Sequence, residues 1–429
     1  MWSGRYTHHC ESWNNFKGLE SDMWALPDGI SSTYKSGFFG KRDYRSGGHT
    51  ILARLSAWLG PVNENRPVFD EDPAQEITLE DSTDPRCHHK DWEHVDQICE
   101  FFKASKDDQK PFFLAYSSGL VHASFKTNRY WYDQIPADLV DIPPEDPAIH
   151  PAIQYQRMAK AWRHGFDEKV VRQVRRIYFA MCAETDFLLG RVLDAVNSLG
   201  LQDETTIIFT SDHGELALEH QDYYKMSLYE GSVRVPMIIS GPGLAKKLKL
   251  PNLVSLIDLC PTLLELMDQP RRWDLDGESL LPLLQGETTE SRNTAYAMFS
   301  GCTLNTTGFM FRKGPWKLIA YTGYHPQVFN LDDDPMELLD RAATEPEIVA
   351  DLTEQLQQMV DMETTHADWI AYNKQAFREF QRQAKRGLYV DNAYGLKGCP
   401  SSDYMTIMDN AFTGWDASDE DRAAAWLAE

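Results

Sequence analysis

The sequence predicts an α/β fold in which a mainly parallel central sheet is flanked by helices, followed by a smaller C-terminal antiparallel-sheet subdomain. Three short apolar runs bounded by turn residues indicate strands: Phe112–Tyr116, Thr205–Thr210 and Val235–Ser240. None of them alternates with polar residues, which is typical of strands buried on both faces of a parallel sheet. Between the first two runs, residues 171–199 repeat apolar side chains at helical spacing, so a long amphipathic helix is predicted there.

The later part of the chain changes character after about residue 285. The segment LVSLIDLCPTLLELM, which begins at Leu253, predicts one more buried helix. The segments TGFMFRKGPWKLIAY and VFNLDDDPMELLD then indicate antiparallel strands, with a turn at Asp332–Pro335. We therefore divide the chain into an α/β domain over residues 1–285, a small α+β subdomain over residues 286–390 and a surface tail over residues 391–429.

The composition favours a folded protein and leaves a small anionic substrate possible. The chain has 429 residues, 42% of them hydrophobic and 12% aromatic, which is enough for a sizeable core. Its formal net charge of −23 opposes binding to nucleic acid or an acidic membrane, and no apolar run approaches a membrane span. The seven cysteines form no CxxC pair, which disfavours a zinc site. The N-terminus lacks the apolar core of a signal peptide, and no feature indicates the oligomeric state.

Asp212 and His213 come directly after the predicted strand that ends at Thr210. In open α/β sheets, sites form in the loops beyond the carboxyl ends of strands, so this pair is well placed to bind a metal ion. Gly214 then lets the chain turn. Taken alone, however, an Asp-His-Gly triplet is more often a helix N-cap than a metal site.

The residues that follow favour the metal-binding interpretation. Lys225 comes 13 residues after Asp212, and Arg234–Pro236 leads into a strand that ends in the turn Ser240–Gly243. This order resembles that of the sulfatases, members of the alkaline phosphatase superfamily. The resemblance implies a calcium site that uses Asp212 and His213, although imidazole is an unusual calcium ligand. It also implies that Lys225 contacts the sulfate group of a substrate.

Two further stretches resemble the same family in the same order along the chain. Phe39–Lys41 is similar to a Gly-Lys motif whose lysine lies beside the nucleophile and the sulfate. The segment FFLAYSSGLVH, which ends at His122, is similar to a strand and loop that bring a histidine to the sulfate. Taken alone, the first would be read as a turn followed by a solvated lysine, and an ordinary loop histidine is the alternative for His122. The resemblance therefore implies that Lys41, His122 and Lys225 bind the substrate and act in catalysis, with His49 as the nearest candidate for the proton donor.

The nucleophile motif of the family does not occur in this sequence. In sulfatases a formylglycine, made from the first residue of Cys-x-Pro-Ser-Arg, attacks sulfur, and two more Asp ligands come from an N-terminal strand. The string Cys399–Ser402 has the wrong spacing and no arginine. We therefore expect this sequence to begin just after the nucleophile, an upstream segment to encode the missing residues, and the 429 residues alone to be inactive.

The resemblance implies a sulfated sugar as the substrate, such as glucuronate 2-O-sulfate in a glycosaminoglycan, and a lysosomal or secreted protein. A basic run either holds further anionic groups of that substrate or is a solvated helix face. It comprises Arg157, Lys160, Arg163, His164, Lys169, Arg172, Arg175 and Arg176. Three other interpretations stay open: a phosphoryl or phosphonate ester hydrolase of the same superfamily, an inactive glycan-binding protein, and a purely structural role for Asp212 and Lys225.

Overall fold

The computed structural model describes residues 1–13, 18–20, 22–30, 33–41, 77–160, 162, 165–301, 304–387, 403–411 and 414–428. Its strands are β1 (Lys35–Gly40), β2 (Ile77–Glu80), β3 (Phe112–Ser117), β4 (Phe125–Asn128), β5 (Ile207–Thr210), β6 (Met237–Ser240), β7 (Thr294–Ser300), β8 (Thr307–Lys313), β9 (Trp316–Tyr321) and β10 (Gln327–Asn330). Its α-helices are α1 (Thr7–Cys10), α2 (Leu26–Gly29), α4 (His89–Lys106), α5 (Arg129–Tyr132), α6 (Pro151–Ala159), α7 (Glu168–Ser198), α8 (Glu230–Val233), α9 (Leu259–Leu266), α10 (Leu281–Gln285), α11 (Pro346–Met359), α12 (Met362–Lys385), α13 (Tyr404–Ala411) and α14 (Ala417–Ala428). Short 3-10 turns are η2 (Ala137–Leu139), η3 (Glu219–Gln221) and η4 (Leu256–Asp258).

The strands of the α/β part pair two by two. β1 pairs with β3 and β2 with β4 in parallel, whereas β5 and β6 run antiparallel. Residues 211–236 return the chain to the edge of the sheet where β5 ends, so β6 starts there and runs back along it. The three predicted strands are present as β3, β5 and β6, and the parallel pairs flanked by helices confirm the predicted fold class.

The predicted burial of these strands on both faces is wrong. The side chains of β5 are half-buried along its whole length, and those of β6 alternate between half-buried and exposed. Ile238 in β6 is 63% exposed among the described residues. The apolar runs therefore located the strands correctly, but they did not predict how far each strand is exposed to solvent.

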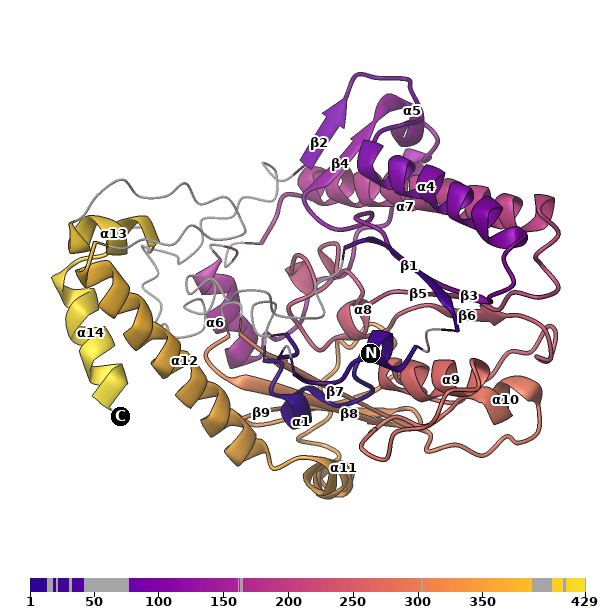
Figure 1. Ribbon diagram of the computed structural model, residues 1–429. Coiled ribbons are helices and arrows are strands. Elements are labelled where there is room, and N and C mark those ends of the chain that lie inside the picture. The colour runs from indigo at the N-terminus through magenta and orange to yellow at the C-terminus, as the bar shows by residue number, and fades with distance from the viewer. Residues whose placement is uncertain are drawn as a thin grey trace.

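Helices α4 and α7 lie side by side (Figure 1); α7 packs on the strands β2 and β4, and α4 packs on β1. The predicted amphipathic helix is present as α7, which begins after Asp167, whose side chain accepts a hydrogen bond from the Lys169 backbone N–H. The predicted apolar positions Val174, Ile177 and Leu188 are buried in a core shared with α4 and β4. None of the helices in the described ranges is long and apolar enough to cross a bilayer.

The C-terminal part contains the predicted antiparallel sheet, in the order β10-β9-β8-β7. Helix α11 packs on this sheet through Leu352 and Leu356. Helices α13 and α14 occupy part of the predicted tail and pack on the end of α12 (Figure 1). The domain boundaries at residues 285 and 390 stay predictions.

A buried lysine joins the C-terminal sheet to the α/β part. Lys317 in β9 is 0% exposed, and its ammonium lies 2.9 Å from Glu230 in α8 and 2.7 Å from Glu337. Arg312 in β8 contacts the other carboxylate oxygen of Glu230 at 3.0 Å. Residues 211–229, which join β5 to α8 and carry Lys225, are called the Lys225 loop. The short helix α8 that follows this loop is thus attached to the C-terminal sheet.

Candidate active site

A cavity of about 1690 Å³ opens beside the end of β5. Four of the predicted site residues border it: His122, Asp212, His213 and Lys225. Apolar side chains of β6, among them Ile238, line another part of the same cavity. Charged and imidazole groups thus lie beside apolar side chains in one cavity, as in many ligand pockets.

Asp212 and His213 place an oxygen and a nitrogen donor close together. His213 Nε2 lies 3.6 Å from Asp212 Oδ2, and His213 Nδ1 lies 2.9 Å from the Gly214 carbonyl oxygen. Because a carbonyl accepts only, the proton belongs on Nδ1, and Nε2 keeps a lone pair toward the carboxylate. Burial lowers the pKa of His213, which keeps the ring neutral. This donor set fits a divalent cation and would supply two of the roughly six to eight ligand atoms that a calcium ion needs.

The interpretation of Asp212 as a helix N-cap is wrong. Residues 211–218 form no helix. Gly214 instead donates a 2.7 Å backbone hydrogen bond to Ser232, and a Cβ on Gly214 would lie 2.1 Å from the Gly231 carbonyl oxygen. Glycine is therefore needed where the two backbone segments meet, and this contact fixes the place of Asp212.

Lys225 and His122 meet at the rim of the cavity, with Lys225 Nζ 2.5 Å from His122 Nε2. His122 Nδ1 lies 2.5 Å from the Ala123 carbonyl oxygen, so Nδ1 donates and Nε2 accepts from the ammonium. Loss of water around the ring, followed by the charge of Lys225, lowers the pKa of His122. A neutral imidazole therefore holds a cationic lysine at the mouth of the cavity.

Lys41 follows β1, whose parallel partner β3 leads into the His122 loop. Its backbone N–H donates to the Ser117 carbonyl oxygen at 2.9 Å, which extends the pairing of the two strands by one bond. Its positive charge contributes to the lowered pKa of both His122 and His213. Lys41 thus lies within electrostatic reach of both imidazoles.

The structure brings five of the predicted site residues into one neighbourhood: Lys41, His122, Asp212, His213 and Lys225. Their roles as sulfate and metal ligands stay predictions. His49 and Cys399–Ser402 lie outside the described residues.

The loop that precedes Lys225 rests on a buried group of charges. His220 Nδ1 lies 2.7 Å from Asp146, and Arg157 lies 3.1 Å from the same carboxylate and 3.8 Å from Asp222. Although burial opposes it, the hydrogen bonds from His220 and Arg157 hold the pKa of Asp146 below its usual value. Burial raises the pKa of Asp222 to about 6, although the charge of Arg157 opposes the rise. The Asp222 carboxylate accepts no hydrogen bond from any described residue.

The basic run predicted from sequence is largely used inside the protein. Arg157 and Arg175 are buried, and Arg175 pairs with Asp141 at 2.7 Å, so the hypothesis that they contact further substrate anions is wrong. Arg176 donates to the Ile135 carbonyl oxygen. Lys160 is also buried but borders the cavity, with its ammonium 4.6 Å from the ring centre of Trp162. Arg163 and His164 lie outside the described residues.

Sequence reasoning missed two buried carboxylates behind the site. Asp91 on α4 accepts hydrogen bonds from the loop that carries His122, and Glu184 on α7 binds the start of α4. Both lie far along the chain from their partners, so no local pattern marks them. Sequence reasoning also missed Glu215, which follows the Asp-His-Gly triplet. Burial raises the pKa of Glu215 to about 7.

Comparison with known proteins identifies relatives over most of the chain. A family model described as Sulfatase matches residues 1–269, and one described as N-sulphoglucosamine sulphohydrolase, C-terminal, matches residues 218–363. Arylsulfatase K of Rattus norvegicus is 36% identical over 410 residues, which cover 88% of this chain and 71% of the relative. In fold, the chain is similar to a phosphonate monoester hydrolase from Silicibacter pomeroyi (TM-score 0.64, 18% identity, 83% of each chain). It is also similar to BT1596, a 2-O GAG sulfatase (TM-score 0.62, 22% identity, 88% of this chain and 81% of that chain).

Proposed function

Because the chain belongs to the sulfatase family, we propose that its cavity binds a sulfated sugar, with calcium as the divalent metal ion of the site. Sulfatases are sulfuric ester hydrolases, and the family generally uses a divalent metal ion. The observation that carries the proposal is the 2.5 Å contact between Lys225 and His122, beside the facing Asp212 and His213 side chains. An anion and a cation then have adjacent places at one cavity.

Each residue has a proposed role. The ammonium groups of Lys41 and Lys225 neutralise charge on the sulfuryl oxygens, which counts for more in a cavity than in open water. Lys225 has three hydrogens, so it can keep its bond to His122 while it donates to the sulfate. Asp212 and His213 would hold calcium, which supplies positive charge beside the anion. His49 is the proposed proton donor to the leaving alcohol.

The proposed substrate is a glycosaminoglycan sulfate such as glucuronate 2-O-sulfate, and the proposed location is lysosomal or secreted. Support comes from the arylsulfatase K relatives, and the fold is shared with a 2-O glycosaminoglycan sulfatase. Calorimetric titration with 2-O-sulfated glucuronate and iduronate disaccharides and an unsulfated disaccharide tests it. Lys225→Ala is expected to weaken binding of the sulfated glucuronate about 10- to 100-fold, because a charged hydrogen bond is lost. The control Lys103→Ala removes an exposed lysine on α4, and an equal loss there would reject the site.

Calcium binding is tested separately by titration and by elemental analysis. The described residues offer two protein ligands, so affinity is expected to be weak, on the order of 10⁻⁴–10⁻³ M. Asp212→Ala is expected to abolish it, whereas Asp194→Ala, which changes an exposed aspartate on α7, leaves it unchanged. Equal calcium content in both variants would contradict the assignment.

We further propose that residues 1–429 bind this substrate without hydrolysing it. Lys225 is a cation that binds the anion, while Asp212 and His213 hold the metal, so none of them serves as the nucleophile. Purified protein with calcium is expected to leave aryl sulfates and sulfated disaccharides intact. Metal-dependent release of sulfate would overturn this proposal.

A second candidate is hydrolysis of a phosphonate ester, which the fold likeness to a phosphonate monoester hydrolase favours. Lys225 and His122 would serve a phosphonate oxygen as well as a sulfate oxygen. Titration with a phosphonate monoester and a sulfate monoester of the same alcohol separates the two. Tighter binding of the phosphonate would favour the second candidate, and glycan binding that ignores both sulfate and Lys225 would favour a non-catalytic glycan-binding protein.

A further inference from the structure

We propose that Asp91 is a positioning residue that holds His122 toward the bound anion, an inference that rests on the anion site proposed above. Asp91 lies in the first turn of α4 and is 5% exposed. Its Oδ1 atom accepts three hydrogen bonds of 2.8 Å each, from Tyr116 Oη, Ser118 Oγ and the Gly119 backbone N–H. These donors lie at the end of β3 and at the start of the His122 loop.

The contacts continue from Asp91 to His122 without a break. Ser118 Oγ also accepts from the Leu120 backbone N–H at 3.1 Å, and the His122 N–H donates to the Gly119 carbonyl oxygen at 3.0 Å. A Cβ on Gly119 would lie 3.1 Å from Asp91 Oδ2, so the loop backbone lies directly against the carboxylate. One buried acceptor therefore sets the path of an exposed loop, and that path decides where the His122 ring stands.

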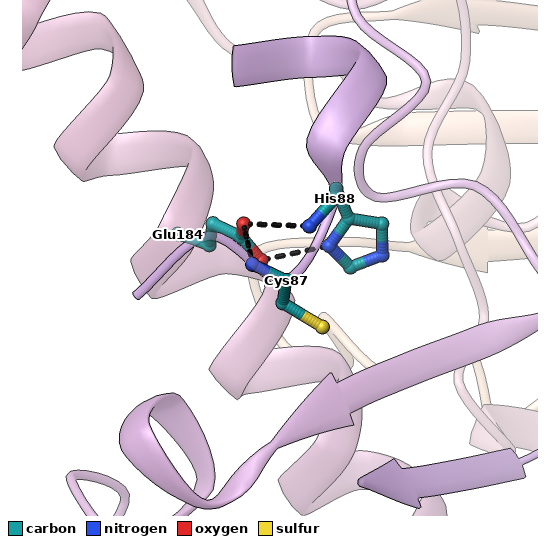
Figure 2. Close-up of side chains that lie close together, drawn as sticks. All are labelled: Cys87, His88 and Glu184. Atoms are coloured by element: carbon teal, nitrogen blue, oxygen red, sulfur yellow. Dashed lines mark hydrogen bonds and ion pairs between the residues drawn. The ribbon is translucent and has the colours of Figure 1, made fainter. Parts of the chain in front are cut away.

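Helix α4 is itself fixed at the turn that carries Asp91. The carboxylate of Glu184 on α7 is fully buried and accepts from the Cys87 and His88 backbone N–H groups, from His88 Nδ1 at 2.7 Å and from Trp92 Nε1 at 2.8 Å. Figure 2 shows this carboxylate facing the Cys87 and His88 nitrogens, while the Cys87 sulfur points away from it.

Cys87, His88 and Glu184 lie close enough to suggest a metal site, but their hydrogen bonds favour a structural role that holds the start of α4 against α7. The carboxylate oxygens already have four donors, and burial together with Glu184 raises the pKa of the Cys87 thiol to about 12, far from the thiolate that binds metals. Two carboxylates in succession therefore connect α7 to His122. Glu184 fixes the start of α4, and Asp91 on α4 fixes the loop.

The test measures affinity for inorganic sulfate by calorimetry on the 429-residue chain. Asp91→Ala is expected to weaken sulfate binding about tenfold, by analogy with residues that orient metal ligands. Asp91→Asn keeps an oxygen in the Oδ1 position and is expected to retain most of the affinity. Asp96→Ala, five residues along the same helix, removes a surface pair with Arg191 and is the matched control, expected to bind sulfate like the unmodified protein.

A double-mutant cycle separates positioning from general destabilisation. If Asp91 acts through His122, Asp91→Ala causes no further loss of sulfate affinity in a His122→Ala background. An additive loss in the double variant would overturn the inference. Loss of sulfate binding in Lys225→Ala supports the anion site itself, independently of Asp91.

A second measurement tests the role of Asp91 even if the protein binds no sulfate. A failure to bind sulfate would refute the proposed anion site but not the positioning role of Asp91. The His122 ring signals, identified by their absence in His122→Ala, are followed by NMR in the sulfate-free protein. They are expected to move in Asp91→Ala and to stay in place in Asp96→Ala. Unchanged His122 signals in Asp91→Ala would refute the positioning role, whatever the sulfate titration shows.

Discussion

The loops that carry His122 and Lys225 meet at 2.5 Å but are held in opposite ways. The His122 loop rests on Asp91, whose Oδ1 accepts three hydrogen bonds. The Lys225 loop rests on ion pairs around Arg157, and there the Asp222 carboxylate accepts no hydrogen bond from any described residue. A buried carboxylate with donors costs little, whereas one held by charge alone retains most of its desolvation cost. We therefore expect the stability of the Lys225 loop, but not that of the His122 loop, to depend strongly on charge balance and on pH.

The largest expected effect is on the Lys225 side of this comparison. Arg157→Leu leaves the buried carboxylates of Asp146 and Asp222 without their common cation. We expect the free energy of unfolding to fall by about 3–5 kcal/mol. Urea unfolding followed by circular dichroism measures it. The control Arg172→Leu breaks a surface pair with Glu168 and one hydrogen bond to the Val140 carbonyl oxygen. It should cost no more than about 2 kcal/mol, so equal losses would contradict the comparison.

A smaller, pH-dependent effect is expected at Asp222. Burial raises its pKa from 3.8 to about 6, so the folded protein binds this proton more tightly than the unfolded chain does. Its stabilising contribution is therefore fully present below about pH 4 and is lost as the pH rises through about 6. Asp222→Asn should remove that slope, which amounts to about 3 kcal/mol. Unfolding curves between pH 4 and 8 measure the difference, and parallel pH profiles for the two proteins would refute it.

The smallest expected effect concerns the His122 loop. Gly119→Ala places a methyl group 3.1 Å from Asp91 Oδ2, so the loop must shift by a few tenths of an ångström. We expect a loss of about 1 kcal/mol in unfolding free energy, because the contact is tight but the loop is exposed. Gly190→Ala is the control, since a Cβ there meets nothing within 4 Å in the middle of α7 and alanine should stabilise the helix by up to about 1 kcal/mol. Stabilisation by both substitutions would show that the loop is not closely held.

Sequence patterns predicted the parts of the site that lie next to strand ends. Asp212 follows β5, which the apolar pattern predicted, whereas the resemblance to sulfatases indicated Lys41, after β1, and His122, after β3. The antiparallel course of β6 could not be predicted, because it depends on where a long loop brings the chain back.

The supporting carboxylates could not be found in the same way. Asp91 precedes its partner Gly119 by 28 residues, and Glu184 follows His88 by 96, so only the packed α4 and α7 bring them together. Arg157 and Arg175 belong to a basic run that we expected either to hold substrate anions or to form a solvated helix face, yet both are buried in ion pairs. A charge pattern alone does not tell whether its partner is a ligand or another residue.

The buried lysine of β9 has a consequence for the order in which the chain is made. Glu230 emerges from the ribosome 87 residues before Lys317, its partner in the finished protein. At a synthesis rate of roughly 5–20 residues per second, this carboxylate waits for roughly 4 to 17 seconds before the lysine exists. During that interval the Lys225 loop lacks its attachment to the C-terminal sheet. The Lys225 loop can therefore take its final place beside the cavity only after β9 has been made, several seconds after the loop itself.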